Sequence, residues 1–298
     1  MQIIDGFMTI PKLSLALGTF DGIHLGHKEV IESAVNFAKK YETKSAVITF
    51  KEHPFAYLHN TKPLYLCTRE QKIEQIEKLG VDYLIEIDFK EIANLTPEQY
   101  LKDVILKYFS PKAISTGFNH RFGKGQAGDV QFLAFFEDKY YYVYSATPPK
   151  QIYGEVISTT KIKNYLKNRN IAVANTMLGR EFSIKGKVIH GKNLGKALGF
   201  PTANISYHEN IIPIDFGVYS TKIKTKDGNI YKALTNFGVA PTVSNINEAF
   251  LESYILDFSG DLYNQDIEIF FVKNIRPEIK FNCIADLTAQ IEKDIKHI

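Results

Sequence analysis

The apolar residues of this chain change their spacing near its middle, and that change limits what the chain can fold into. In the first half, short buried runs such as SAVITF (residues 45–50) alternate with helix-spaced segments such as HKEVIESAVNFAKKY (residues 27–41). From about Phe182 onward the pattern is mainly strands. Strands that alternate with helices favour a parallel sheet covered on both faces, whereas closely spaced strands favour a small antiparallel barrel. The sequence therefore predicts an α/β domain followed by a β-barrel domain.

The expected elements follow from the same pattern. In the first half, strands are expected at 13–20, 45–50, 81–89 and 112–118, and helices at 27–41, 69–80 and 97–109. In the second half, strands are expected at 183–190, 202–206, 217–225, 229–237, 249–258 and 266–275, followed by a closing helix at 285–298. Two short helices at 158–178 connect the halves, so the predicted domains are 1–181, connector included, and 182–298. Asn264 suits a left-handed position in the hairpin turn before the last strand.

Charge and cysteine content exclude several classes of protein. The net charge of the 298 residues is only +3, which argues against nucleic acid or a membrane as the main partner. Cys67 and Cys283 lie far apart without paired spacing, which predicts free thiols in a reducing compartment. The N-terminal segment does not look like a signal peptide, and no apolar run is long enough for a membrane span. We expect a soluble, cytoplasmic protein.

The segment GTFDGIHLGH (residues 18–27) carries the first candidate site. Gly18 ends a predicted strand, and His24 and His27 stand where the next helix begins. A helix N-terminus attracts phosphate, and Gly22 and Gly26 let the backbone approach it closely. Histidines three residues apart face the same way and can donate to a phosphate that gains charge in a transition state. The alternative is that one histidine caps the helix and the other is a surface residue.

Two later loops could complete this site. In TGFNHRFGKGQAGD (residues 116–129), a Gly-rich loop follows a strand and offers Asn119 and Arg121 as polar groups. Ligands of parallel sheets bind at the carboxyl ends of the strands, so this loop should converge with the one after Gly18. In STTKIKNYL (residues 158–166), hydroxyls followed by lysines suit a clamp on the β- and γ-phosphates of ATP. They also suit an ordinary helix start.

A second glycine cluster predicts a different phosphate site in the barrel half. GKVIHGKNLGKALGFPTANI (residues 186–205) contains four closely spaced glycines, whose backbone N–H groups can wrap a polyphosphate. Thr202 and Asn204 supply the neutral oxygen ligands that suit Mg²⁺. Glu252 stands in an otherwise apolar strand and is a candidate general base. The glycines could instead serve barrel turns, and Glu252 could face solvent.

Taken in order, these segments resemble a known family. GTFDGIHLGH, ITFKEHP and TGFNHRFGKGQAGD are similar to the adenylyltransferase module of bacterial FAD synthetases. The glycine cluster, FLESYILDFSGDLYNQDI and NIRPEIKFNCIADLTAQIEKDI are similar to riboflavin kinase. Nearly the whole chain thus resembles the bifunctional bacterial riboflavin kinase/FMN adenylyltransferases.

The resemblance implies a Rossmann-like nucleotidyltransferase domain and a riboflavin kinase barrel with a terminal helix. It implies two ATP-dependent steps, riboflavin to FMN with release of ADP, then FMN to FAD with release of pyrophosphate. Mg²⁺ is the implied cofactor, the partners are these small molecules, and the chain is expected to be a monomer or weak homo-oligomer. The implied residues are, for catalysis, His24, His27, Asn119 and Glu252; for ATP and phosphate, Gly18, Phe20, Gly22, Gly26, Ser158, Thr159, Lys161, Gly186, His190, Gly191 and Gly195; for flavin, Arg121, Asn236 and Arg276; for Mg²⁺, Thr202 and Asn204.

Five positions depart from the family's usual residues. They are His120 for phenylalanine, Gln126, Lys161 and Ala240 for arginine, and Tyr254 for histidine. These changes bear on flavin affinity and on the balance of the two activities. The alternatives are that only one activity is retained, with FMN adenylyl transfer the first candidate, that the substrate is another phosphorylated small molecule, or that the chain is a non-catalytic regulator binding flavin or nucleic acid.

Overall fold

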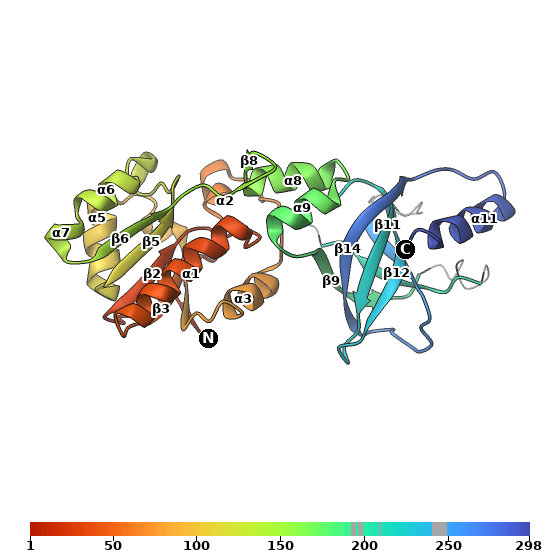
Figure 1. The fold of residues 1–298 in the computed structure, drawn as a ribbon, viewed down its shortest axis with the longest axis horizontal. Coiled ribbons are helices and arrows are strands. Elements are labelled where there is room, and N and C mark those ends of the chain that lie inside the picture. Colours follow the sequence, from red (N-terminus) through yellow and green to blue (C-terminus); the bar gives the residue numbers. More distant parts are fainter. Residues whose placement is uncertain (192–194, 196–198, 209, 240–248) are drawn as a thin grey trace. The chain divides into compact units, whose positions relative to one another are not determined.

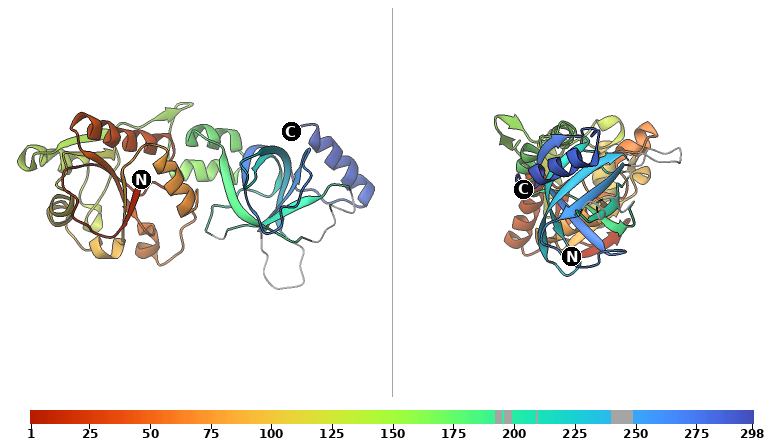
Figure 2. Two further views of the ribbon diagram at one scale, coloured as in Figure 1. Left: turned by 90° about the horizontal axis from the view of Figure 1, so that it is seen from below. Right: turned by 90° about the vertical axis from the view of Figure 1, so that its right-hand side faces the viewer.

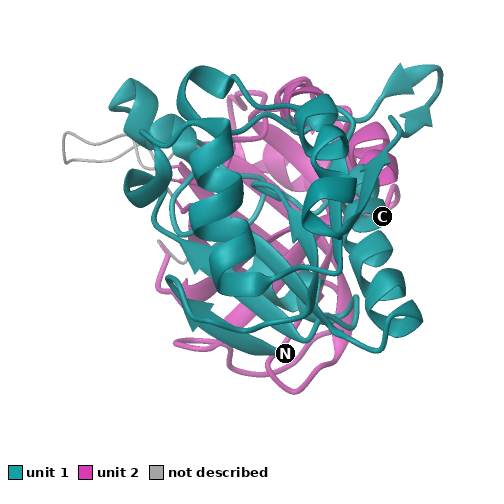
Figure 3. Cartoon of the chain, turned by 90° about the vertical axis from the view of Figure 1, so that its left-hand side faces the viewer, with its two compact units in different colours: residues 1–159 teal, residues 160–298 magenta. Residues whose placement is uncertain are grey.

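A computed structural model of the protein describes residues 1–191, 195, 199–208, 210–239 and 249–298. The chain forms two compact units, Met1–Thr159 and Thr160–Ile298, which are coloured separately in Figure 3. The division falls earlier than the predicted boundary after residue 181, and both connector helices, apart from residue Thr159, are grouped with the second unit. Each unit is described by itself.

The first unit contains a six-stranded parallel sheet in the order β1-β4-β3-β2-β5-β6 (Figure 1). The strands are β1 (Gln2–Asp5), β2 (Leu13–Leu17), β3 (Lys44–Phe50), β4 (Tyr83–Ile87), β5 (Ala113–Gly117) and β6 (Val143–Thr147). The chain runs from β2 to one side of the sheet and later returns to β5 on the other side. The strand order therefore reverses between β2 and β5, and that is where ligands of such sheets bind.

Helices cover both faces of this sheet. On one face, α1 (Leu25–Lys40) buries an apolar stripe that includes Ile31 and Ala34 and shares a core with α3 (Arg69–Glu77). On the other face lies a core built with the π-helical segment η1 (Tyr100–Phe109), which follows the short helix α5 (Pro97–Gln99). The predicted parallel sheet is thus confirmed, and the single helix expected at 97–109 is divided.

Besides the edge strands β1 and β6, the first unit contains shorter elements that the pattern does not predict. They are α2 (Pro54–His59), α4 (Phe89–Ile92), the 3₁₀ turn η2 (Lys124–Gln126), α6 (Val130–Phe135), α7 (Glu137–Tyr140) and the small hairpin of β7 (Gln151–Ile152) and β8 (Glu155–Val156).

The second unit is a closed antiparallel barrel in the order β10-β13-β12-β11-β14-β9 (Figure 2). Its strands are β9 (Phe182–Ile189), β10 (Thr202–Ser206), β11 (Gly217–Lys224), β12 (Ile230–Val239), β13 (Ala249–Ile255) and β14 (Asp266–Pro277). The helices α8 (Thr159–Lys167) and α9 (Ile171–Leu178) lead into the barrel, and α11 (Ile284–Ile295) follows it. The barrel, its terminal helix and the left-handed Asn264 (φ 62°) are as predicted.

Helix α9 is tied to the barrel by one asparagine side chain. The Asn175 amide nitrogen donates to the Phe271 carbonyl at 2.8 Å, and the Asn175 amide oxygen accepts from the Phe182 backbone N–H at 2.7 Å. These two bonds link the helix to β14 and to the first residue of β9, so the second connector helix is part of the barrel unit.

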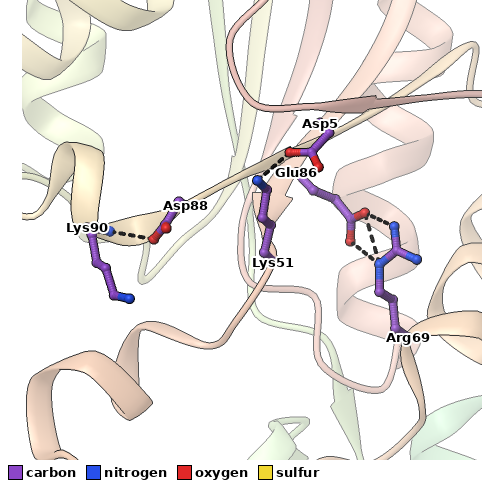
Figure 4. Close-up of polar contacts among 6 residues, drawn as sticks. All are labelled: Asp5, Lys51, Arg69, Glu86, Asp88 and Lys90. Carbon is purple, nitrogen blue, oxygen red and sulfur yellow. Dashed lines mark hydrogen bonds and ion pairs between the residues drawn. The ribbon is translucent and has the colours of Figure 1, made fainter.

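A buried carboxylate stands near the carboxyl end of β4. Glu86 is 4% exposed, and both of its oxygens lie 3.1 Å from Nε of Arg69, the first residue of α3. Figure 4 shows this pair beside a more exposed one between Lys51 and Asp5. An ionised carboxylate removed from water requires such a partner. The Arg69–Glu86 pair therefore fixes the start of α3 against the sheet.

Replacing Arg69 with leucine should lower the free energy of unfolding of the first unit by about 1–3 kcal/mol, because it leaves the Glu86 charge buried without its partner. Adding Glu86→Leu to that variant should recover most of the loss, since the uncompensated charge is then gone. Lys51→Leu is the control and should change little, because its ion pair is exposed. Denaturant titrations followed by circular dichroism would measure all three, and no recovery in the double variant would contradict this account.

Candidate active sites

The loop between β2 and α1 has an unusual backbone. Phe20 and Ile23 have φ values of 52° and 40°, a left-handed region that side chains with Cβ atoms rarely adopt. Both side chains are buried, at 2% and 0% exposure, which holds the strained backbone in place. At Gly22, also left-handed with φ 78°, a Cβ atom would lie 2.6 Å from the Leu66 side chain. The backbone of this loop is therefore fixed by its own buried side chains and by the close approach of Leu66.

The predicted histidine pair lies at the start of α1. His24 is the N-cap, and its Nδ1 accepts a hydrogen bond of 3.2 Å from the backbone N–H of His27. The two imidazole rings stack with centroids 3.6 Å apart, so they face the same way as predicted. Because Nδ1 of His24 is an acceptor, the proton of its neutral ring is on Nε2. Capping the helix and presenting a donor are therefore compatible roles.

Small residues and an aromatic ring set the space around this pair. The Phe20 ring meets the His27 ring edge-on, with centroids 5.4 Å apart. At Gly18, a Cβ atom would lie 2.9 Å from the Phe20 ring, and at Gly26 it would lie 3.3 Å from the His24 imidazole. Both glycines thus leave room for the rings.

A segment distant in sequence reaches the same loop. The Thr159 hydroxyl, at the first residue of α8, donates to the Asp21 carbonyl at 3.3 Å. Asp21 is 5% exposed, and its carboxylate accepts from the backbone N–H of Leu66 at 2.8 Å. The predicted Ser158–Thr159 segment therefore lies beside the loop between β2 and α1 (residues 18–24), the histidine loop. Lys161 follows two residues later in α8.

The loop after β5 carries the other predicted residues of this site. β5 pairs with β2, so this loop follows the strand next to the histidine loop. Asn119 is exposed there. Arg121 donates from Nη1 to the Asp129 carboxylate at 3.2 Å, which holds its guanidinium beside the start of α6.

His120, in the same loop, stacks on Phe122 with ring centroids 5.7 Å apart. Burial lowers the pKa of His120 to about 4. The imidazole is therefore neutral near pH 7 and acts as an aromatic ring, as phenylalanine would.

The lowered pKa of His120 gives the first unit a pH-dependent stability. The unfolded chain binds the proton below about pH 6.5 and the folded chain only below about pH 4, so stability is complete above pH 6.5 and decreases as the pH falls toward 4. At pH 5 this histidine should cost about 2 kcal/mol relative to pH 7. In His120→Phe that part of the loss should be absent. Denaturant titrations at pH 5 and 7 would measure it, and an equal pH dependence in both proteins would contradict the assignment.

In the second unit, three predicted side chains meet across two neighbouring strands. Asn204 in β10 is opposite Glu252 in β13. The Thr202 hydroxyl donates to the Glu252 carboxylate at 2.7 Å, and Asn204 is 8% exposed. Glu252 thus faces a hydroxyl and an amide.

The glycines of the second cluster have different surroundings. A Cβ atom at Gly191 would lie 2.5 Å from the Asn204 amide nitrogen, and one at Gly195 would lie 2.4 Å from the Phe200 carbonyl. These two glycines therefore allow the chain to pass close to β10. Gly186 instead packs on the Ile205 side chain within the barrel. His190 stacks on Tyr263 with centroids 3.9 Å apart. Ala240 lies outside the described residues.

A cavity of about 250 Å³ extends from this cluster into the barrel unit. Its polar wall includes Thr202, Glu252 and Asn236, and its other walls include Tyr254, Phe281 and residues of α11 such as Ile291. An apolar cavity with a few converging polar groups is the usual form of a small-molecule site. Glu278, which directly follows β14, and Asp294 of α11 also line it and were not predicted, because nothing in the local sequence indicates that either residue lies at a cavity.

Arg276 lines the cavity and also fastens α11. Its Nε donates to the Asp294 carboxylate at 2.8 Å, and its Nη1 donates to the Pro277 carbonyl at 3.1 Å. Gln290 donates to the other oxygen of Asp294 at 2.7 Å. Because Asp294 is 1% exposed, this bridge is an internal attachment of the helix to β14.

Three general features complete the description. Cys67 and Cys283 are thiols, as predicted. In the part of the chain that the structure describes, no helix is long and apolar enough to cross a membrane. Among the same residues, no group of three or more His, Cys, Asp or Glu side chains is arranged to hold a metal ion.

One candidate site lies at a helix start on a parallel sheet, and the other is a carboxylate site on a barrel. Together they indicate a class of protein, a two-domain enzyme that transfers phosphate-containing groups. Family models agree with both halves: FAD synthetase matches residues 8–161, and riboflavin kinase matches residues 178–298. Two curated relatives are called bifunctional riboflavin kinase/FMN adenylyltransferase. The one from Haemophilus influenzae is 32% identical, covering 99% of this chain and 97% of the relative, and the one from Listeria monocytogenes is 34% identical, covering 97% and 92%.

A solved structure described as a macrolide-efflux protein from Streptococcus pneumoniae has the same fold, with a TM-score of 0.89, 26% identity, and coverage of 99% of this chain and 98% of that one. The chain belongs to the family of bifunctional riboflavin kinase/FMN adenylyltransferases.

Proposed function

We propose that the second unit phosphorylates riboflavin to FMN with ATP, and that the first unit transfers the adenylyl group of a second ATP to FMN, giving FAD and pyrophosphate. The observation that carries this proposal is that each unit has its own arranged group of polar residues. These are the stacked His24–His27 pair in the first unit and the Thr202–Glu252 hydrogen bond beside a cavity in the second.

In the adenylyl transfer, a phosphate oxygen of FMN attacks the α-phosphorus of ATP, and the bond to the β-phosphate oxygen breaks. Negative charge grows on the α-phosphate during this step. The N-terminus of α1 and the imidazoles of His24 and His27 are suited to stabilise it. No covalent enzyme intermediate is needed, so positioning and charge stabilisation account for the catalysis.

The neighbouring loops are proposed to hold the substrates of this step. Ser158, Thr159 and Lys161 would hold the released phosphates, since the start of α8 offers hydroxyls and a cation together. Asn119, in the loop after β5, would contact the α-phosphate, and Arg121 would lie near the flavin.

In the phosphorylation, the terminal hydroxyl of the riboflavin ribityl chain attacks the γ-phosphorus of ATP, and ADP leaves. Glu252 is suited to accept the hydroxyl proton, because its carboxylate lies at the cavity wall and already accepts one hydrogen bond. The cavity beneath α11 would receive the isoalloxazine ring, with Asn236 and Arg276 at its edge.

Mg²⁺ is proposed as the cofactor of both steps. In the second unit, the Thr202 hydroxyl and the Asn204 amide fit such an ion, because both are neutral oxygen ligands beside the close chain passage at Gly191 and Gly195. When bound, the ion neutralises charge on the phosphates of ATP. His190 directly follows the last residue of β9, next to Gly191. Gly186 is left out of the proposed site because it packs against Ile205 inside the barrel.

Replacing His27 with alanine should lower the rate of FAD formation from FMN by roughly 10²-fold or more, the loss expected for one transition-state donor. FMN formation from riboflavin should persist in this variant, because its residues lie in the other unit. Separate chromatographic assays from FMN and from riboflavin would measure the two rates. Equal losses in both would mean that the sites are not independent.

The reciprocal change is Glu252→Gln, which keeps the side-chain size and an oxygen that can accept from Thr202. It should lower FMN formation by roughly 10²-fold, because the amide cannot take the proton, while FAD formation from FMN stays near wild type. The same pair of assays applies. Normal FMN production by Glu252→Gln would remove this residue from the role of base.

A further inference from the structure

One lysine of the first unit, Lys72, donates a hydrogen bond to the histidine loop, although the sequence did not predict it as a residue of that site. The Lys72 ammonium donates to the Thr19 carbonyl at 3.0 Å and to the Thr49 hydroxyl at 2.7 Å. The Thr49 hydroxyl in turn donates to the same Thr19 carbonyl at 3.0 Å. A single backbone oxygen of the loop thus accepts from two side chains that come from α3 and β3.

Burying the Lys72 ammonium group costs free energy, which its hydrogen bonds to Thr19 and Thr49 offset. Burial lowers the pKa of Lys72, and nearby Arg69 lowers it further, whereas Cys67, Glu86 and Asp21 act against the shift. Thr49 is 0% exposed, so its hydroxyl also depends on these partners. The helix that carries Lys72 is fixed at its start by a capping box between Thr68 and Gln71. The backbone from which the Lys72 side chain extends is therefore fixed.

The Thr19 carbonyl is one peptide unit from Phe20, whose ring contacts His27. Phe20 follows it with a left-handed φ of 52°, and its ring meets His27 edge-on. A strained backbone keeps one conformation only when its surroundings determine it. Releasing the Thr19 carbonyl would let Phe20 relax and would change the contact that places His27.

We propose that Lys72, together with Thr49, is a positioning residue for adenylyl transfer, which holds the Thr19 carbonyl so that Phe20 sets the orientation of His27. This inference rests on the proposed catalytic role of the histidine pair. Lys72 itself touches neither substrate nor reacting atoms in this account.

The test uses the unaltered chain, four single variants and one double variant. Lys72→Met removes the donor at similar volume, Thr49→Val removes the hydroxyl with the same shape, Thr49→Ser keeps the hydroxyl, and His27→Ala provides the background. Lys72→Met should lower kcat for FAD formation by roughly 10- to 100-fold with KM for FMN changed less than about threefold, because orientation rather than binding is lost. Thr49→Val should lower the same kcat several-fold, and Thr49→Ser should change it little. Riboflavin phosphorylation should be unchanged in all of them.

The decisive comparison is Lys72→Met in the His27→Ala background. If Lys72 acts through His27, adding Lys72→Met to His27→Ala should lower kcat for FAD formation by less than about threefold, because the residue that Lys72 positions is already absent. An equal factor in both backgrounds would overturn the inference and leave Lys72 as a stabilising residue only. Near-normal kcat in Lys72→Met beside an impaired His27→Ala would also overturn it.

Two further outcomes separate this inference from the proposed function. Full FAD formation by His27→Ala would refute the role of the histidines themselves. If Lys72→Met does not fold, Thr49→Val against Thr49→Ser decides, since only the hydroxyl differs in its contact with the Thr19 carbonyl. Equal rates in these two variants would then refute the proposal.

Discussion

The hydrogen bond from the His27 backbone N–H to His24 Nδ1 is the interaction around which the first unit is arranged. It starts α1 at the carboxyl end of β2, beside the point where the strand order of the sheet reverses. It also fixes which nitrogen of His24 carries the proton and brings the two rings together. The left-handed residues before it, the Thr159 contact and the Lys72 contact all act to hold this one turn of the chain.

In the second unit, a different backbone arrangement is proposed to bind phosphate. In the first unit, the start of helix α1 is the proposed phosphate-binding surface. In the barrel, Gly191 and Gly195 let the chain run against β10, where Thr202 and Asn204 lie next to the Glu252 carboxylate. The barrel itself is closed, so α11 and its Arg276–Asp294 bridge form the remaining wall of the cavity. Under the proposed function, the histidine pair of the first unit and Glu252 of the second unit serve separate steps.

Much of the fold could be predicted from local pattern, and the exceptions have physical causes. The central strands β2 to β5 are continuous buried runs, which a parallel sheet requires, and the barrel strands are bounded by turn residues. The edge strands β1 and β6 were missed because they are half exposed and show no such run. The histidine pair could be found because both residues lie in one helical turn. Lys72, Glu278 and Asp294 could not, because only the tertiary fold brings them to their sites.

Two separate activities on one chain can be measured by a chromatographic product assay of the wild-type protein with ATP and Mg²⁺. The assay would be run once from riboflavin and once from FMN, each with oxidised and reduced flavin. FMN should form from riboflavin, and FAD should form from FMN. FAD from FMN with riboflavin left untouched would contradict the kinase half and direct attention to Tyr254, and no product from either would contradict the account as a whole.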